Sequence, residues 1–201
     1  MKKILLTLIM AAMLLMGAQV SWATVYTFVP PDPDMGDLDH SFAYSWGMNQ
    51  SLAPGEVIIG ARMQFININN WQIEPDILYA RLLDNAPAGI MTYRDNQASG
   101  DYFNGQGISL FTWTDDNEYF DGTRWINPPE NLTYRFSEDE IAALNLAIAD
   151  GNFGLGFDPD CHYYNDRIRF QFITRVVPEP ASLSLLGLGL LGLLGRKRIK
   201  A

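Results

Sequence analysis

A regular alternation of side chains in the middle of the chain constrains its fold more than any other feature. In two segments, Val57, Ile59, Ala61, Met63 and Phe65 alternate with Ile58, Gly60, Arg62, Gln64 and Ile66, and Ile168, Phe170 and Phe172 alternate with Arg167, Arg169 and Gln171. A period of two places successive side chains on opposite faces of an extended strand. Each segment therefore predicts a β-strand with one buried face.

Shorter apolar runs predict the remaining strands. They lie at 25–29, 41–48, 76–83, 108–114, 132–136 and 153–157, separated by stretches rich in turn residues. One helix is expected between strands, because Ser137 and Glu140 form a capping box and Gly151 supplies a left-handed stop. About eight short strands indicate an all-β fold, an antiparallel β-sandwich or jelly roll over residues 24–176. We expect the helix to join two strands across one end of the sandwich.

Residues 1–23 have the three parts of a secretory signal peptide. Two lysines follow the initial methionine, an apolar run without charge comes next, and Ser21 and Ala23 place small side chains before a cut after Ala23. We expect a signal helix that directs export through the Sec translocon and is removed by signal peptidase. The alternative is an uncleaved membrane anchor.

The carboxyl-terminal segment, residues 177–201, also combines an apolar run with basic residues. Val177, Pro178, Glu179 and Pro180 precede an uncharged run at 181–195, and Arg196, Lys197 and Arg198 follow it. As a helix this run spans roughly 22 Å, which is short against about 30 Å of bilayer hydrocarbon. The basic residues would stop translocation and stay on the cytoplasmic side. We expect a single transmembrane helix here, with an extended proline motif at the opposite membrane surface.

The order of these three parts closely resembles the PEP-CTERM protein-sorting signal. Proteins of that family are exported by Gram-negative bacteria that make exopolysaccharide. The resemblance implies processing by an exosortase, a membrane protease, after which the protein moves to the cell surface or extracellular matrix. The same cassette is sometimes named after ice-binding proteins, and that name implies nothing about residues 24–176. A plain anchor that is never processed is the alternative.

The charge of the central segment excludes one class of partner. Between Ala23 and Val177 the chain has 8 arginines, no lysine and 22 carboxylates. An unaided nucleic-acid binder needs a basic surface to replace the counterions of the phosphates, so we expect no nucleic-acid partner. Cys161 is the single cysteine, which excludes an intrachain disulfide. We expect it to be buried rather than to act as a nucleophile with its neighbour His162.

An acidic segment between two predicted strands is the best candidate for a metal site. Asp158, Asp160, Asn165 and Asp166 offer the oxygen ligands that Ca²⁺ prefers, although their spacing is not that of an EF-hand. The alternative, which we favour, is a turn without metal that is capped by these side chains. Two further acidic stretches, at 32–40 and 115–121, are expected to be solvated loops.

Aromatic residues are the remaining candidates for ligand binding. Most tryptophans are expected in the core, whereas Tyr163 and Tyr164 are the best candidates for exposure. The sequence offers no recognisable set of catalytic residues, so we expect a structural or carbohydrate-binding module with exopolysaccharide as candidate partner. The alternative is a hydrolase acting on polysaccharide through a pair of carboxylates.

Overall fold

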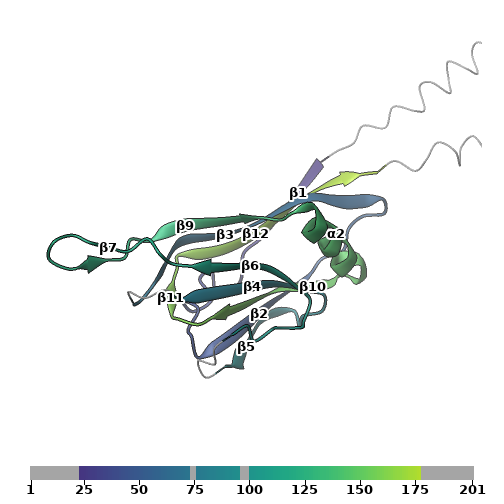
Figure 1. Cartoon of the computed structure of the whole chain (residues 1–201). Coiled ribbons are helices and arrows are strands. Elements are labelled where there is room, and N and C mark those ends of the chain that lie inside the picture. Colours follow the sequence, from purple (N-terminus) through teal and green to yellow (C-terminus); the bar gives the residue numbers. More distant parts are fainter. Residues whose placement is uncertain (1–22, 73–75, 96–99, 178–201) are drawn as a thin grey trace, which may run out of the picture.

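Two antiparallel sheets pack face to face in the part of the chain that the computed structural model describes, residues 23–72, 76–95 and 100–177 (Figure 1). Sheet A contains β1 (Ala23–Phe28), β12 (Arg167–Val176), β3 (Glu56–Asn70), β9 (Glu130–Arg135) and the short β11 (Tyr163–Tyr164). Sheet B has the order β5 (Gly89–Arg94), β2 (Phe42–Asn49), β10 (Asn152–Pro159), β4 (Ile77–Leu83) and β6 (Ile108–Thr114). The predicted antiparallel β-sandwich is confirmed.

One α-helix, α2 (Glu138–Ala147), connects β9 of sheet A to β10 of sheet B at one end of the sandwich, as expected (Figure 1). Its amino terminus has the predicted capping box, in which Ser137 and Glu140 bond each other's backbone amides. A single 3-10 turn, η1 (Ile148–Asp150), continues it, and Gly151 stops it with φ of 83°. The Asn145 side chain bonds both backbone groups of Ile58, which fixes the helix to β3.

The expected signal helix and transmembrane helix lie outside the described residues. Within the described ranges, no helix is both long enough and apolar enough to span a bilayer.

The longest pairing of the fold joins β3 to β12, the two strands with the clearest alternation. Ala61 opposes Phe172, and Met63 opposes Phe170, so both strands direct these side chains into the core. The alternation does not continue unbroken to Val57, because the register shifts near Ile59. At this bulge Ile58 becomes buried whereas Ile59 is 48% exposed, which reverses the expectation for these two residues.

Aromatic rings fill the space between the sheets. Phe65 of sheet A meets Phe157 of sheet B edge to face, with ring centroids 5.6 Å apart. Phe28 and Phe170 contact Phe153 in the same way, at 6.5 and 6.2 Å. These contacts cross from one sheet to the other, so burial of aromatic rings holds the two layers together.

Sheet B is covered on its outer face as well, which explains the glycines in β2 and β10. A Cβ on Gly154 would lie 2.5 Å from the Cβ of Ala86, and one on Gly156 would lie 2.9 Å from the ring of Phe103. Ala86 and Phe103 belong to a second buried cluster on this face. The outer face of sheet A has no such constraint at Gly60, where an added Cβ would meet nothing within 4 Å.

Four short strands were not predicted. β5 and β11 are weakly patterned, and β7 (Tyr119–Phe120) pairs with β8 (Trp125–Ile126) in a stretch that we expected to be only a turn. Figure 1 shows the β7 hairpin projecting from the body at the end opposite α2. Its aromatic side chains are more than half exposed, so no core contact signals these strands in the sequence.

Two glycine substitutions test whether the outer face of sheet B is covered while that of sheet A is open at Gly60. Gly154→Val should lower the free energy of unfolding by about 2–3 kcal/mol, because the new side chain overlaps Ala86 and the Trp46 backbone. Gly60→Val should change it by no more than about 0.5 kcal/mol, because valine favours strands and the space is open. Urea unfolding of both variants measures this, and equal destabilisation would contradict a covered outer face on sheet B and an open one on sheet A.

Candidate functional site

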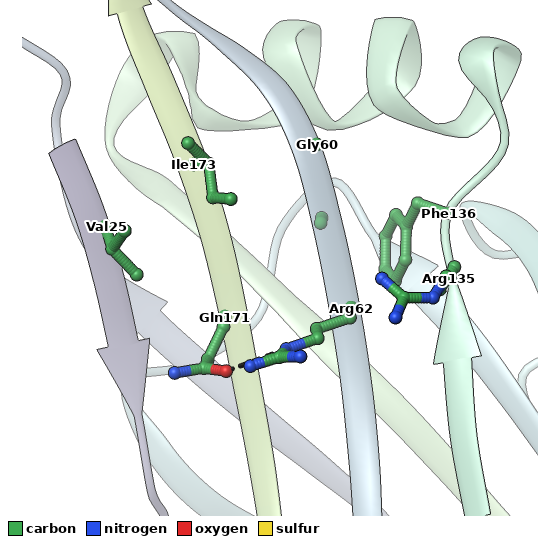
Figure 2. Close-up of a pocket in the computed structure, with 8 residues that line it drawn as sticks. Val25, Gly60, Arg62, Arg135, Phe136, Gln171 and Ile173 are labelled. Carbon is green, nitrogen blue, oxygen red and sulfur yellow. Dashed lines mark hydrogen bonds between the residues drawn. The ribbon is translucent and has the colours of Figure 1, made fainter. Parts of the chain in front are cut away.

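A groove of about 380 Å³ crosses the outer face of sheet A. Its lining comes from four neighbouring strands and from the start of the connection to α2 (Figure 2): Val25, Gly60, Ala61, Arg62, Arg135, Phe136, Gln171 and Ile173. The absence of a side chain at Gly60 leaves the groove open in the middle of β3. The lining therefore combines apolar surface with two guanidinium groups and an amide.

A polar row runs across this groove perpendicular to the strands. Arg135 of β9 lies directly opposite Arg62 of β3. Arg62 Nε donates to Gln171 Oε1 at 2.8 Å, and Gln171 Nε2 donates to Thr27 Oγ1 at 2.7 Å, as Figure 2 shows for the first of these bonds. The amide of Gln171 thus orients the Arg62 guanidinium. The sequence shows these residues at polar positions of alternating strands, but it does not show which strands are neighbours.

The predicted calcium ligands form hydrogen bonds with different parts of the chain. Asp158 lies inside β10 and accepts a hydrogen bond from the Tyr102 backbone amide, at 2.6 Å. Asn165 instead donates to the Asp34 carbonyl, and Asp166 accepts from the Asn67 side chain. In the described ranges, no three His, Cys, Asp or Glu side chains are grouped so that they could hold a metal ion.

The short strand β11 lies between the two pairs along the chain. Asp158 and Asp160 precede this strand and sit near other aspartates, whereas Asn165 and Asp166 follow it and fasten neighbouring loops. Asn165 and Asp166 thus bond residues far away in the sequence, and neither the calcium site nor the locally capped turn is tested by these bonds.

The two aspartates at the end of β10 share an unusually acidic and buried environment. Asp158 is only 1% exposed, and one of its carboxylate oxygens has no hydrogen-bond partner among the described residues. Burial, reinforced by the negative charges of Asp95, Asp160 and Asp101, raises the pKa of Asp158 to about 7. Burial together with Asp76 and Asp95 raises the pKa of Asp160 to about 6.

Cys161 is buried, as expected, and is unsuited to nucleophilic chemistry. It is 4% exposed, and burial together with the nearby Asp76 raises the pKa of its thiol to about 12. Tyr163 was expected at the surface but is fully buried, with its ring 5.5 Å from that of Trp113. Tyr164, by contrast, is 44% exposed, in agreement with the prediction.

Both histidines of the chain meet at one end of the sandwich beside exposed aromatic rings. The ring centroids of His40, Trp71 and His162 lie 6.2–6.4 Å from one another, and Tyr164 is 5.0 Å from His162. Trp71 is 51% exposed, so the expectation that tryptophans lie mainly in the core fails here and at Trp125 of the hairpin. This cluster offers a second surface on which a planar or ring-shaped ligand can stack.

The two acidic stretches, residues 32–40 and 115–121, contain buried residues and hydrogen bonds to the backbone. In residues 32–40, Met35 and Leu38 are buried, Asp34 accepts from the Gly36 amide, and Asp39 accepts from the Ser41 amide. The bond from Ser41 lowers the pKa of Asp39. Asp115, at the start of the second stretch, is fully buried and accepts from the Asn70 amide at 2.8 Å. The expectation of a solvated loop fails at Met35, Leu38 and Asp115, which are buried, whereas Asp32, Asp116 and Asp121 are exposed.

The raised pKa of Asp158 predicts a pH-dependent stability. The folded state keeps the Asp158 proton to a higher pH than the unfolded state does, because the pKa of Asp158 is higher in the folded state. Protonated Asp158 therefore contributes fully to the free energy of unfolding below about pH 4, and this contribution is lost as the pH rises through about 7. Asp158→Asn should remove this loss, which is on the order of 4 kcal/mol, and raise stability at pH 8 relative to wild type.

Urea unfolding between pH 4 and 8 measures the effect. Asp84→Asn, which removes the same charge from an exposed position, serves as the control and should leave the pH profile unchanged. A profile for Asp158→Asn that parallels wild type would contradict the assigned burial cost.

The tail beyond the sandwich is identified by comparison with known proteins. Residues 176–198 match the family model described as the PEP-CTERM protein-sorting motif. The match begins at Val176, the last residue of β12, and includes the predicted motif from Val177 to Pro180 and the basic residues at 196–198. A search of curated proteins finds no match to the chain. The chain therefore carries a PEP-CTERM protein-sorting motif directly after its β-sandwich, which indicates export, transient anchoring in a membrane and sorting by an exosortase.

Proposed function

We propose that the chain is a non-enzymatic component of the cell surface or exopolysaccharide matrix of a Gram-negative bacterium. In this proposal the Sec translocon exports it, signal peptidase cuts after Ala23, and an exosortase processes it near Val177–Pro180. The sorting motif at residues 176–198 is the observation that carries the proposal. The β-sandwich then serves as a structural or carbohydrate-binding module outside the cell.

The positions of Ala23 and Val176 on sheet A are compatible with a cut at each end of the sandwich. Ala23 pairs with Arg175, so the described chain starts and finishes on adjacent strands at one end of sheet A (Figure 1). A cut after Ala23 removes only the first residue of β1 and leaves its pairing with β12 from Thr24 onward. The β7 hairpin lies at the opposite end of the sandwich from the start of β1 and the end of β12.

Sorting is tested by the intact mass of the protein from its native host, after membrane and surface fractions are separated. The wild-type protein should occur outside the inner membrane with a mass ending near residues 177–179. Glu179→Ala should remain in the membrane with a mass extending to Ala201, whereas Glu130→Ala, a control at an exposed position outside the matched tail, should be processed normally. A wild-type protein that keeps Ala201 and stays in the membrane would establish the unprocessed anchor instead.

The carbohydrate-binding proposal rests on the groove in sheet A and on the exposed rings. Groove volumes of a few hundred Å³ with mixed apolar and polar lining are typical of small-ligand sites. A glycan array with the purified full chain tests it, and binding without chain shortening is the expected result. Shortening of a bound polysaccharide would favour the hydrolase.

The hydrolase remains the second proposal, on one specific observation. A different hollow is lined by Asp32 and Asp39, together with Gly36, Phe42 and Tyr44. Asp34 raises the pKa of Asp32, whereas the Ser41 amide lowers that of Asp39, and a carboxylate pair in hydrolysis needs such opposite shifts. If any chain shortening is found, Asp39→Asn should abolish it.

A further inference from the structure

The arginines of the chain are concentrated on the outer face of sheet A. Five of the eight arginines between Ala23 and Val177 occupy outward positions on three adjacent strands: Arg62, Arg135, Arg167, Arg169 and Arg175. The remainder of this segment carries three arginines and all 22 carboxylates. One face of a strongly acidic domain is therefore basic.

Neutral residues surround the arginines in the central part of this face. The outward positions beside the groove carry Ala23, Val25, Thr27, Gly60, Gln64, Thr133, Gln171 and Ile173. The two carboxylates on these strands are each the first residue of a strand: Glu56 of β3 accepts hydrogen bonds from Tyr26 and Thr174 and lines a different hollow with Arg175, and Glu130 of β9 is exposed. Among the described residues, the one ion pair of the domain joins Arg81 to Asp101, far from these strands in the other sheet.

The arrangement of two of these arginines lowers the stability of the protein when no ligand is bound. Arg62 and Arg135 lie directly opposite each other across two strands, and like charges in that arrangement repel. Arg62 Nε donates a hydrogen bond to Gln171, so the two terminal nitrogens of the Arg62 guanidinium group can bind a ligand. A bound anion would relieve the repulsion between Arg62 and Arg135 and accept hydrogen bonds from their terminal nitrogens in the groove.

The groove between these arginines also has an apolar component. Val25 and Ile173 line it on one side of β3, and Phe136 lies on the other, with Gly60 open between them (Figure 2). A saccharide ring has apolar C–H faces as well as polar edges. An acidic sugar could place its ring on this surface while its carboxylate lies between the guanidinium groups.

We propose that this groove binds an acidic polysaccharide through the carboxylates of its uronic-acid units. Guanidinium groups bind carboxylates through two parallel hydrogen bonds, which suits arginine better than lysine, and the domain contains no lysine. The acidic remainder of the domain repels such a polymer and leaves sheet A as its docking face. This inference rests on the proposed function, because it names the ligand class of the carbohydrate-binding module.

The test measures binding of polygalacturonate to the full chain in neutral detergent, with neutral dextran for comparison. The wild-type protein should bind polygalacturonate and not dextran, and the affinity should fall as NaCl is raised from about 50 to about 500 mM. The double variant Arg62→Gln with Arg135→Gln should weaken binding at least tenfold. Arg124→Gln, which removes a charge from the exposed β7–β8 turn, is the matched control and should bind as wild type does.

A second variant separates ligand contact from folding. Gly60→Val fills the groove without removing charge, so it should weaken polygalacturonate binding while its urea unfolding remains like that of wild type. Unchanged binding in both the arginine double variant and Gly60→Val would overturn the proposal. Dextran binding as tight as polygalacturonate binding would also overturn it, because the arginines would then have no role.

Other occupants of the face are distinguishable outcomes. Tighter binding to duplex DNA, or to micelles containing phosphatidylglycerol, would replace the saccharide with a phosphate-bearing partner. Self-association that disappears in the arginine double variant, without polygalacturonate binding, would make the face an interface between copies. The detergent-solubilised chain is tested whether or not it is sorted, so a negative result here and a failure of exosortase processing are independent.

Discussion

The pairing of β12 with β3 is the contact on which the rest of the molecule depends. It joins residues about 100 positions apart along the chain, and β1 and β9 are added on either side of it. The same register sets both faces of sheet A. It directs Phe170 and Phe172 toward the aromatic core and leaves Arg169 and Gln171 on the outside. Stability and the proposed ligand surface therefore arise from a single ladder of hydrogen bonds.

Much of this architecture follows from local patterns in the sequence. The alternation in β3 and β12, the capping box at Ser137 and the stop at Gly151 act over a few residues, and each leads directly to an observed element. The bulge at Ile59 does not follow, because it arises where the Asn145 side chain of α2 bonds Ile58, 87 residues away. β5 also escapes prediction, since an edge strand with mixed exposure has no clear period.

The candidate sites were less predictable than the fold, for a related reason. A cluster such as Asp158–Asp166 is compact in sequence, yet its members bond different parts of the chain, Asp158 the Tyr102 amide and Asn165 the Asp34 carbonyl. The arginines of sheet A are dispersed in sequence and become neighbours only through strand pairing. The carboxyl-terminal tail was the exception, because a sorting signal is read as a linear segment and needs no tertiary contact to be recognised.

The place where the tail leaves the sandwich has a mechanical consequence. Val176 ends a strand that is hydrogen-bonded on both sides, to β1 and to β3. If the chain is held through its carboxyl end and loaded at the distant β7 hairpin, the force runs along β12. The hydrogen bonds between strands are perpendicular to that direction, so they resist together in shear instead of opening one at a time. The sandwich is thus arranged to bear tension along the line from its tether to its free end.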